Sequence, residues 1–148
     1  MKERTPNLDP LLLLLLFVAG SLLFYRLSEP EDSLIFDEAY YVQAARAIAG
    51  LPVAPEGLPE DWYSGGDPNA EHPPLAKLVM AAGIRFFQAN ALGWRLPSVA
   101  LGLSSLMLLY ALTRQLGGSR GQARLAVTIL DFANLFFVHS RSASLDIY

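Results

Sequence analysis

Long apolar blocks alternate with short polar stretches along this chain. The run from Leu11 to Tyr25 is almost unbroken, and residues 8–27 supply the roughly 20 residues that a membrane-spanning helix needs. Two further apolar blocks cover residues 96–113, where Pro97 is expected in the first turn, and residues 125–138, with a possible extension back to Ser119. The pattern therefore predicts three membrane spans.

The first block also has features of a cleaved signal peptide, because Ala19-Gly20-Ser21 resembles a small-residue cleavage site. The apolar run continues past that site through Phe24 and Tyr25, which favours an uncleaved anchor. Lys2 and Arg4 precede the block and indicate that the N-terminus lies in the cytoplasm.

A long outer loop with juxtamembrane helices, residues 28–95, is expected between the first two spans. Its first part predicts a helix over Asp37–Ala49, with Asp37 as N-cap and Gly50 just after the end. Tyr41, Ala45 and Ile48 fall on one face of this helix. The part from Leu51 to Pro74 is rich in proline and glycine and predicts a loop, in which Trp62 and Tyr63 serve as interfacial anchors or pack locally.

The block Leu75–Asn90 decides the topology, because it is apolar but short and carries Lys77 and Arg85. If it crossed the membrane, the loop 114–124, with three arginines and no acid, would lie outside, against the positive-inside rule. We therefore expect this block to lie on the outer surface and the arginine loop to be cytoplasmic. Residues 139–148 then begin a second outer loop.

Composition and charge narrow the class of protein. Hydrophobic residues make up 53% of the 148 residues and charged residues 17%, which is typical of an integral membrane protein. The chain has no cysteine, so it has no disulfide framework. Its net charge of −3 gives no basic surface for nucleic acid.

The expected topology brings several polar side chains to the same outer face. The adjacent acids Asp37 and Glu38 start a helix, where acids are also favoured simply as caps. His72 follows Glu71 and precedes two prolines, and a loop histidine is most often just solvated. Arg95 precedes a span, where it either anchors the helix beside Trp94 or grips a phosphate.

Two polar residues lie inside the third apolar block. Asp131 and Asn134 are three residues apart and would share one helix face. Polar groups at this depth mark either helix packing or a functional site, so an ion or proton path of a transporter stays open. Beyond the block, Arg141 and Asp146 are either loop residues or part of the outer site.

Four short motifs occur in order along the chain. They are Asp-Glu at 37–38, His-Pro-Pro-Leu-Ala-Lys at 72–77, Arg-Leu-Pro-Ser at 95–98 and Ser-Arg-x-x-x-Leu-Asp at 140–146. Together they resemble the N-terminal part of the protein O-mannosyltransferase family. More broadly, the chain is similar to glycosyltransferases that use a polyprenyl-phosphate sugar, including the lipid A aminoarabinose transferases.

This resemblance implies a fold and a set of roles. The fold would be the N-terminal part of an all-α, multi-spanning type C glycosyltransferase, with a juxtamembrane helical first outer loop. Asp37 would be the catalytic base and Glu38 its supporting neighbour. Substrate-binding positions would be His72, Arg95, Arg141 and Asp146. No cofactor is assigned, although the resemblance leaves a divalent metal, with Glu71 as a ligand, open.

The expected activity is transfer of a sugar, mannose or similar, from a polyprenyl-phosphate donor to a hydroxyl of a protein or glycolipid. The reaction would take place at the outer face of a bacterial or archaeal cell membrane. A single base implies inversion at the sugar. The alternatives are a noncatalytic membrane subunit or decayed paralogue that binds polyprenyl lipid, and a transporter fragment. Because the chain stops without a polar tail, we expect a longer protein.

Overall fold

A computed structural model describes residues 9–31, 33–35, 37–53 and 71–148. All regular structure in these ranges is helical, which confirms the all-α prediction. The loop positions Trp62 and Tyr63 and the leader residues Lys2 and Arg4 lie outside the described residues. The elements are α1 (Pro10–Phe24), α2 (Glu38–Ile48), α3 (Pro74–Phe87), α4 (Ala91–Gln115), α5 (Arg120–Asp131), α6 (Asn134–His139) and the 3₁₀ turn η2 (Leu145–Ile147).

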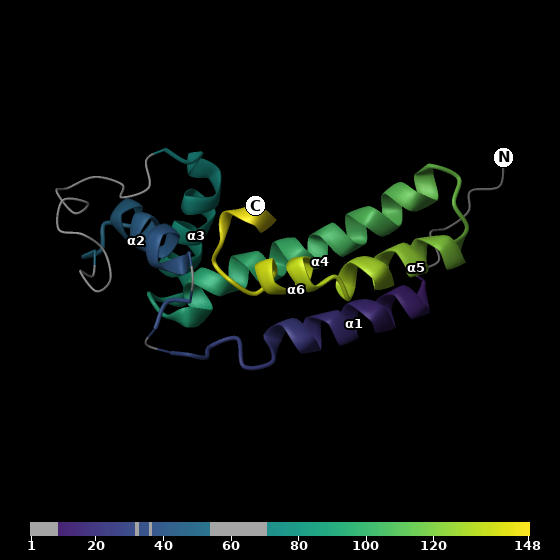
Figure 1. Cartoon of the computed structure of the whole chain (residues 1–148), viewed down its shortest axis with the longest axis horizontal. Helices are drawn as coiled ribbons and strands as arrows, with labels where there is room; N and C mark the ends of the chain where they lie inside the picture. Colours follow the sequence, from purple (N-terminus) through teal and green to yellow (C-terminus); the bar gives the residue numbers. More distant parts are fainter. Residues whose placement is uncertain (1–8, 32, 36, 54–70) are drawn as a thin grey trace.

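The molecule is elongated, and its helices form two groups (Figure 1). Helices α1, α4 and α5, with α6 continuing from α5, run along the long axis, whereas α2 and α3 gather at one end. The turn between α4 and α5 lies at the other end. Among the described helices, α4 alone is both long and apolar enough to cross a membrane, and α1 is a shorter apolar helix of 15 residues.

A polar clasp, formed by Asp9, Tyr110 and Arg124, joins three helices at the end away from α2 and α3. Asp9 caps α1 by accepting from the amide of Leu11. Its carboxylate also binds Arg124 through two hydrogen bonds of 2.8 and 3.0 Å and accepts one of 2.6 Å from the hydroxyl of Tyr110. These bonds hold the start of α1 against α4 and α5.

Helix α4 begins earlier than the sequence predicted. Asn90 caps it by accepting from the amide of Gly93, so Pro97 lies inside the helix and not in its first turn. Proline has no amide hydrogen, so it cannot bond the carbonyl of Gly93. Helix α3 crosses at this point, since a Cβ on Gly83 would lie 2.6 Å from the Cγ of Pro97 and closer still to that carbonyl oxygen.

The third apolar block is not one helix. A capping box of Ser119 and Gln122 starts α5 at Arg120, in agreement with the expected extension to Ser119. The helix then stops at Asp131, because Ala133 takes extended backbone angles before α6 begins. The expectation that Asp131 and Asn134 share a helix face is therefore wrong: Asp131 is buried, whereas Asn134 is exposed.

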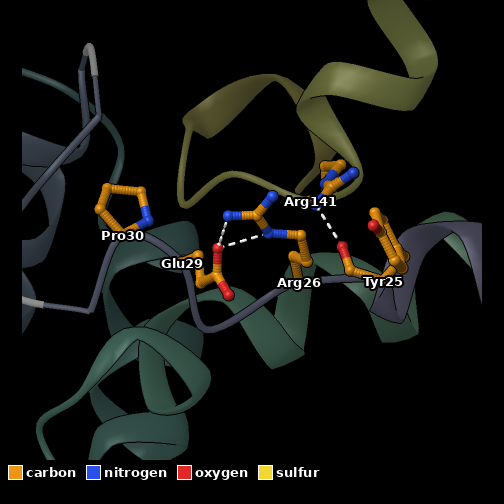
Figure 2. A pocket seen from close by; sticks show the side chains of 5 residues that line it. All are labelled: Tyr25, Arg26, Glu29, Pro30 and Arg141. Atoms are coloured by element: carbon orange, nitrogen blue, oxygen red, sulfur yellow. Dashed lines mark hydrogen bonds and ion pairs between the residues drawn. The ribbon is translucent and has the colours of Figure 1, made fainter.

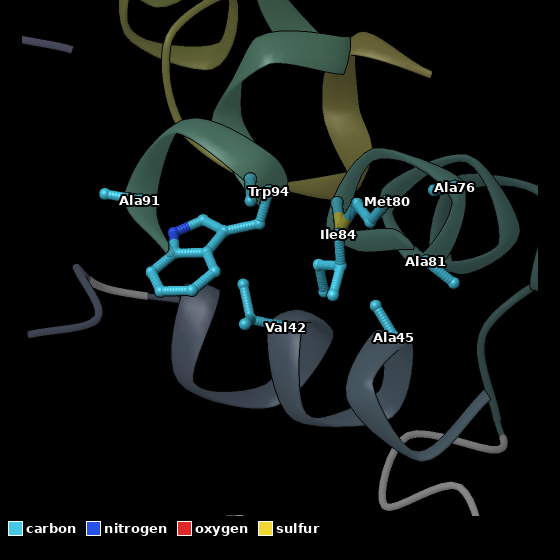
Figure 3. Packing of buried hydrophobic residues seen from close by; sticks show 9 residues of the cluster. Val42, Ala45, Ala76, Met80, Ala81, Ile84, Ala91 and Trp94 are labelled. Carbon is cyan, nitrogen blue, oxygen red and sulfur yellow. The ribbon is translucent and has the colours of Figure 1, made fainter. Parts of the chain in front are cut away.

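The main apolar core lies where α2, α3 and α4 meet. In Figure 3, Val42 and Ala45 of α2 face Met80 and Ile84 of α3, and Trp94 of α4 packs beside Val42. The predicted face of α2 is therefore only partly correct, since Ala45 is buried but Ile48 is 41% exposed. This core holds α2 against the end of α4 and thereby sets the position of Asp37 and Glu38.

Candidate functional site

The two acids at the start of α2 have different surroundings. Asp37 occupies the N-cap position, but its backbone is helical, with φ −70° and ψ −8°, and its side chain makes no capping hydrogen bond. Among the described residues its half-exposed carboxylate has no hydrogen-bond partner. Capping, the simplest explanation of this acid from the sequence, is therefore not what the side chain does here.

Glu38 is fully engaged and 1% exposed. Its Oε1 accepts from Arg95 Nε at 2.8 Å and from the amide of Ala143 at 2.9 Å. Its Oε2 accepts from Arg95 Nη2 at 2.8 Å and from the amide of Ile35 at 3.0 Å. Four hydrogen bonds fill the acceptor sites of a carboxylate. Glu38 therefore joins α2 to α4 and to the segment that follows α6.

Arg95 lies on the other side of this ion pair and is also 1% exposed. Besides Glu38, its guanidinium donates through Nη1 to the carbonyl oxygens of Leu27 at 3.0 Å and Glu29 at 2.9 Å. The sequence predicts Arg95 near the lipid phosphate, and in the structure its guanidinium is buried among protein acceptors. It ties the end of α1 to the start of α4.

Tyr41 lies one turn after Asp37 and brings together several predicted residues. Its ring meets that of His72 edge to face, with centroids 5.8 Å apart and an interplanar angle of 83°. Burial, together with the charges of Asp37, Asp146 and Glu71, raises the pKa of the Tyr41 hydroxyl above its usual value. An acidic, partly open surface, which we call the Tyr41 site, therefore surrounds this hydroxyl.

The segment that follows α6 contributes one side of the Tyr41 site. His139, the last residue of α6, has its Nδ1 3.3 Å from Asp146 Oδ2 and 2.9 Å from the hydroxyl oxygen of Ser144. The amide of Ala143, in the same turn, is the one that Glu38 accepts. The buried ion pair thus fixes this loop beside α2.

Arg141 points to another part of the surface. It donates through Nη2 to the carbonyl oxygen of Tyr25 at 2.7 Å, and its guanidinium lies 5.3 Å from the centre of the Phe137 ring. Its neighbours are at the end of α1, where it lines a pocket with Arg26 and Glu29 (Figure 2).

The structure therefore groups the predicted residues into three places. Asp37, His72 and Asp146 belong to the Tyr41 site, Glu38 and Arg95 form the buried pair, and Arg141 lies at the end of α1. The sequence did not indicate that Tyr41 contacts His72 or that His139 contacts Asp146. The spacing of four between Asp37 and Tyr41 was a signal that these two residues share a helix face. Within the described ranges, no three His, Asp or Glu side chains converge as a metal site.

Comparison with known proteins agrees with the family resemblance of the four sequence motifs. The model of the family described as dolichyl-phosphate-mannose-protein mannosyltransferase matches residues 71–148, just over half of the chain. A polyprenol-phosphate-mannose–protein mannosyltransferase of Mycolicibacterium smegmatis is 29% identical over 127 residues, which cover 84% of this chain and 23% of the relative. One of the same description from Corynebacterium glutamicum is 30% identical over 116 residues, covering 77% and 22%.

A third relative, an uncharacterized protein of Aquifex aeolicus, is 32% identical over 79 residues, or 53% of this chain and 16% of the relative. The chain thus spans less than a quarter of the length of these curated relatives. No solved structure matches it significantly.

Proposed function

The chain belongs to the dolichyl-phosphate-mannose-protein mannosyltransferase family, and from that premise we propose that it forms part of a membrane enzyme that transfers mannose, or a similar sugar. The donor would be a polyprenyl-phosphate sugar, and the acceptor a hydroxyl of a protein or glycolipid. The reaction would take place at the outer face of a bacterial or archaeal cell membrane.

The proposed topology has three spans. Helices α1 and α4 each cross once, and α5 with α6 forms one broken span of 20 residues, from Arg120 to His139. At 1.5 Å per residue, such a span is about 30 Å long, the thickness of the hydrocarbon core. Helices α2 and α3 then lie at the outer surface, and the turn after α4 lies in the cytoplasm.

One observation supports this function above the others: Asp37 starts a helix without capping it, while its neighbour Glu38 is wholly used inside the protein. A half-exposed carboxylate without a structural task is suited to act as a base. We propose that Asp37 takes the proton of the acceptor hydroxyl. Glu38, through its bonds to Arg95 and Ala143, holds the start of α2 and thereby positions Asp37.

In the proposed reaction, the acceptor oxygen forms a bond to the anomeric carbon of the sugar. The bond between that carbon and the phosphate oxygen breaks, and the lipid phosphate leaves with the electron pair. The acceptor proton goes to Asp37. A single displacement inverts the configuration at the sugar, whereas retention would need a nucleophilic carboxylate. His72, whose ring meets that of Tyr41, and Asp146 would contact the sugar or the acceptor.

The test compares Asp37→Asn with the exposed control Glu31→Gln in the full-length protein. Asparagine keeps the size of the side chain, and no cap is lost, so insertion and thermal stability should be unchanged. Sugar transfer should fall by about 10²–10⁴-fold, the usual contribution of a positioned base. The control should transfer at the wild-type rate.

Two results would contradict the proposal. Wild-type turnover in Asp37→Asn would remove the base assignment. An absence of transfer by the wild type from any polyprenyl-phosphate sugar, with lipid binding intact, would instead favour the noncatalytic lipid-binding protein.

A further inference from the structure

His139 contacts one of the carboxylates of the Tyr41 site, but the proposed reaction gives it no task. It is the last residue of α6, and its Nδ1 lies 2.9 Å from the hydroxyl oxygen of Ser144 and 3.3 Å from Asp146 Oδ2. All three residues belong to one short segment, in which the chain turns back on itself after the helix. The imidazole therefore links the end of α6 to the carboxylate of Asp146.

This contact decides which ring nitrogen of His139 carries a hydrogen. An ionised carboxylate offers only acceptors, so a bare lone pair on Nδ1 would be repelled by Asp146. A hydrogen on Nδ1 instead donates to the hydroxyl oxygen of Ser144 and faces the carboxylate. The charged imidazole carries the same hydrogen. His139 therefore presents an N–H group to Asp146 Oδ2 in both of its charge states.

The three side chains differ in how freely they move. Ser144 is buried, whereas the side chain of His139 is 27% exposed and that of Asp146 is 65% exposed. An exposed aspartate has several rotamers open to it unless a neighbour holds it. The imidazole, itself bonded to a buried hydroxyl, is such a neighbour for one oxygen of Asp146. The other oxygen, Oδ1, then has a set direction.

The backbone of this segment is anchored without His139. Ala143 is buried, and its amide donates to Glu38 at 2.9 Å. Farther along, Tyr148 packs against the core formed by α2, α3 and α4, and its hydroxyl oxygen lies 3.1 Å from that of Ser98. Loss of the imidazole should therefore leave the segment in place and release only the side chain of Asp146.

The released side chain belongs to the Tyr41 site. Three carboxylates act on the hydroxyl of Tyr41, those of Asp37, Asp146 and Glu71. Glu71 has His72 beside it, with Oε1 and Nε2 4.0 Å apart, and Asp37 is the proposed base. Because the anomeric carbon must come within about 3–3.5 Å of the acceptor oxygen, the sugar ring would lie next to Asp37. Asp146 is then the carboxylate left to accept from a sugar hydroxyl.

We propose that His139 is a positioning residue, which holds Asp146 Oδ2 so that Oδ1 accepts a hydrogen bond from a hydroxyl of the transferred sugar. The sugar as ligand rests on the proposed function, whereas the orientation of Asp146 rests on the contacts of His139. The imidazole acts only through Asp146 and takes no part in proton transfer. Its effect should therefore appear in the affinity for the sugar.

Binding is measured on the full-length protein in detergent, with farnesyl phosphomannose as the probe and farnesyl phosphate, which lacks the sugar, as the reference. Asp146→Ala should weaken binding of the mannosyl probe by about tenfold or more, the contribution of a hydrogen bond to a charged group. His139→Leu should weaken it by about fivefold, because its contact with Asp146 is partly exposed. Neither change should affect farnesyl phosphate. Wild-type affinity of His139→Leu for the mannosyl probe would overturn the proposal.

Conservative variants separate positioning from simple support of the turn. His139→Asn keeps an N–H group two bonds from Cβ, where Nδ1 lies, and should bind the mannosyl probe nearly as well as the wild type. His139→Gln moves that group one bond farther and should behave like His139→Leu. The matched control is Ser142→Ala, since the hydroxyl of Ser142 donates to the carbonyl of Val138 at 3.0 Å in the same turn. Equal losses in His139→Asn, His139→Leu and the control would mean that His139 only stabilises the turn.

A double variant tests whether His139 acts through Asp146. His139→Leu combined with Asp146→Ala should bind the mannosyl probe no more weakly than Asp146→Ala alone, because the imidazole then has no carboxylate to hold. Losses that multiply in the double variant would show that the two side chains act separately, and the proposal would be wrong.

The outcomes also separate this proposal from the proposed function, because binding is measured without turnover. A wild type that binds the mannosyl probe through His139 and Asp146, yet transfers no sugar, would keep the positioning role and overturn the transferase. Sugar transfer by His139→Leu with unchanged kcat and unchanged donor KM would keep the transferase and overturn the positioning role. If both proposals hold, His139→Leu should raise the donor KM by about fivefold and change kcat less.

Discussion

Replacing Glu38 with glutamine should destabilise the protein rather than simply slow a reaction. The carboxylate of Glu38 is 1% exposed and accepts four hydrogen bonds, two of them from Arg95. Glutamine has one acceptor oxygen, and its NH₂ group would face N–H donors of Arg95 or of the backbone. The guanidinium of Arg95, which is equally buried, would be left without a counter-charge.

The size of the effect follows from that unpaired charge. Removing one partner of a buried ion pair costs about 3–5 kcal/mol. Since the whole stability of a domain is roughly 5–15 kcal/mol, about a fifth of it or more would be lost. For a chain of this length, that corresponds to a fall of roughly 10 °C in melting temperature.

The assay is a double-mutant cycle on the purified protein in detergent, read by thermal unfolding. Glu38→Gln and Arg95→Met should each lower the melting temperature, and the double variant should be less destabilised than the sum, with a coupling of about 2 kcal/mol or more. The exposed acid Glu31, changed to glutamine, should have an effect within about 0.5 kcal/mol.

Two results would refute this reasoning. Additive single changes would mean that the two side chains do not depend on each other. Single variants with wild-type stability but weakened donor binding would return Arg95 to the lipid-phosphate site and Glu38 to catalysis.

Three further predictions follow from other parts of the structure. Gly83→Ala should destabilise the protein by about 1–3 kcal/mol, because the new Cβ would meet Pro97 at 2.6 Å and the backbone of α4 closer still. The control Gly20→Ala, whose Cβ would have its nearest neighbour at 3.9 Å, should be neutral. The melting temperatures of the two variants test this prediction. The guanidinium and hydroxyl that bind Asp9 hold its pKa well below its usual range. The contribution of the ionised carboxylate to the free energy of unfolding is therefore complete above about pH 4 and is lost as the pH falls toward the lowered pKa. The melting temperature of the wild type should therefore fall as the pH is lowered below about 4, and the melting temperature of Asp9→Asn should fall less over the same range. An impermeant thiol reagent added to intact cells should label Ser33→Cys and not Gln115→Cys, and labelling of the second would contradict the proposed topology.

Helix positions were largely predictable from the sequence, because helix formation depends on neighbours within a few residues. The apolar blocks marked α1, α4 and α5, and the acids before Tyr40 marked the start of α2. The order of four short motifs indicated the family that the comparison then matched over residues 71–148. The ends of α4 and α5 were less predictable, since Asn90 and Ala133 act through cap and backbone geometry.

Long-range pairing was decided by the tertiary structure. Glu38 and Arg95 are 57 residues apart in the sequence. The sequence pattern of an arginine before a span is the same whether that arginine anchors a helix, binds a phosphate or pairs with Glu38. Only the packing of α2 on α4 buries both charges, and burial makes the ion pair obligatory, because an unpaired charge there is too costly. The fold also leaves the side chain of Asp37 without a hydrogen-bond partner among the described residues, and the turn after α6 brings Arg141 to the pocket that Arg26 lines. The sequence by itself therefore determined which residues carry charge at this end of the molecule, and the fold determined which of them are bonded inside the protein and which stay at its surface.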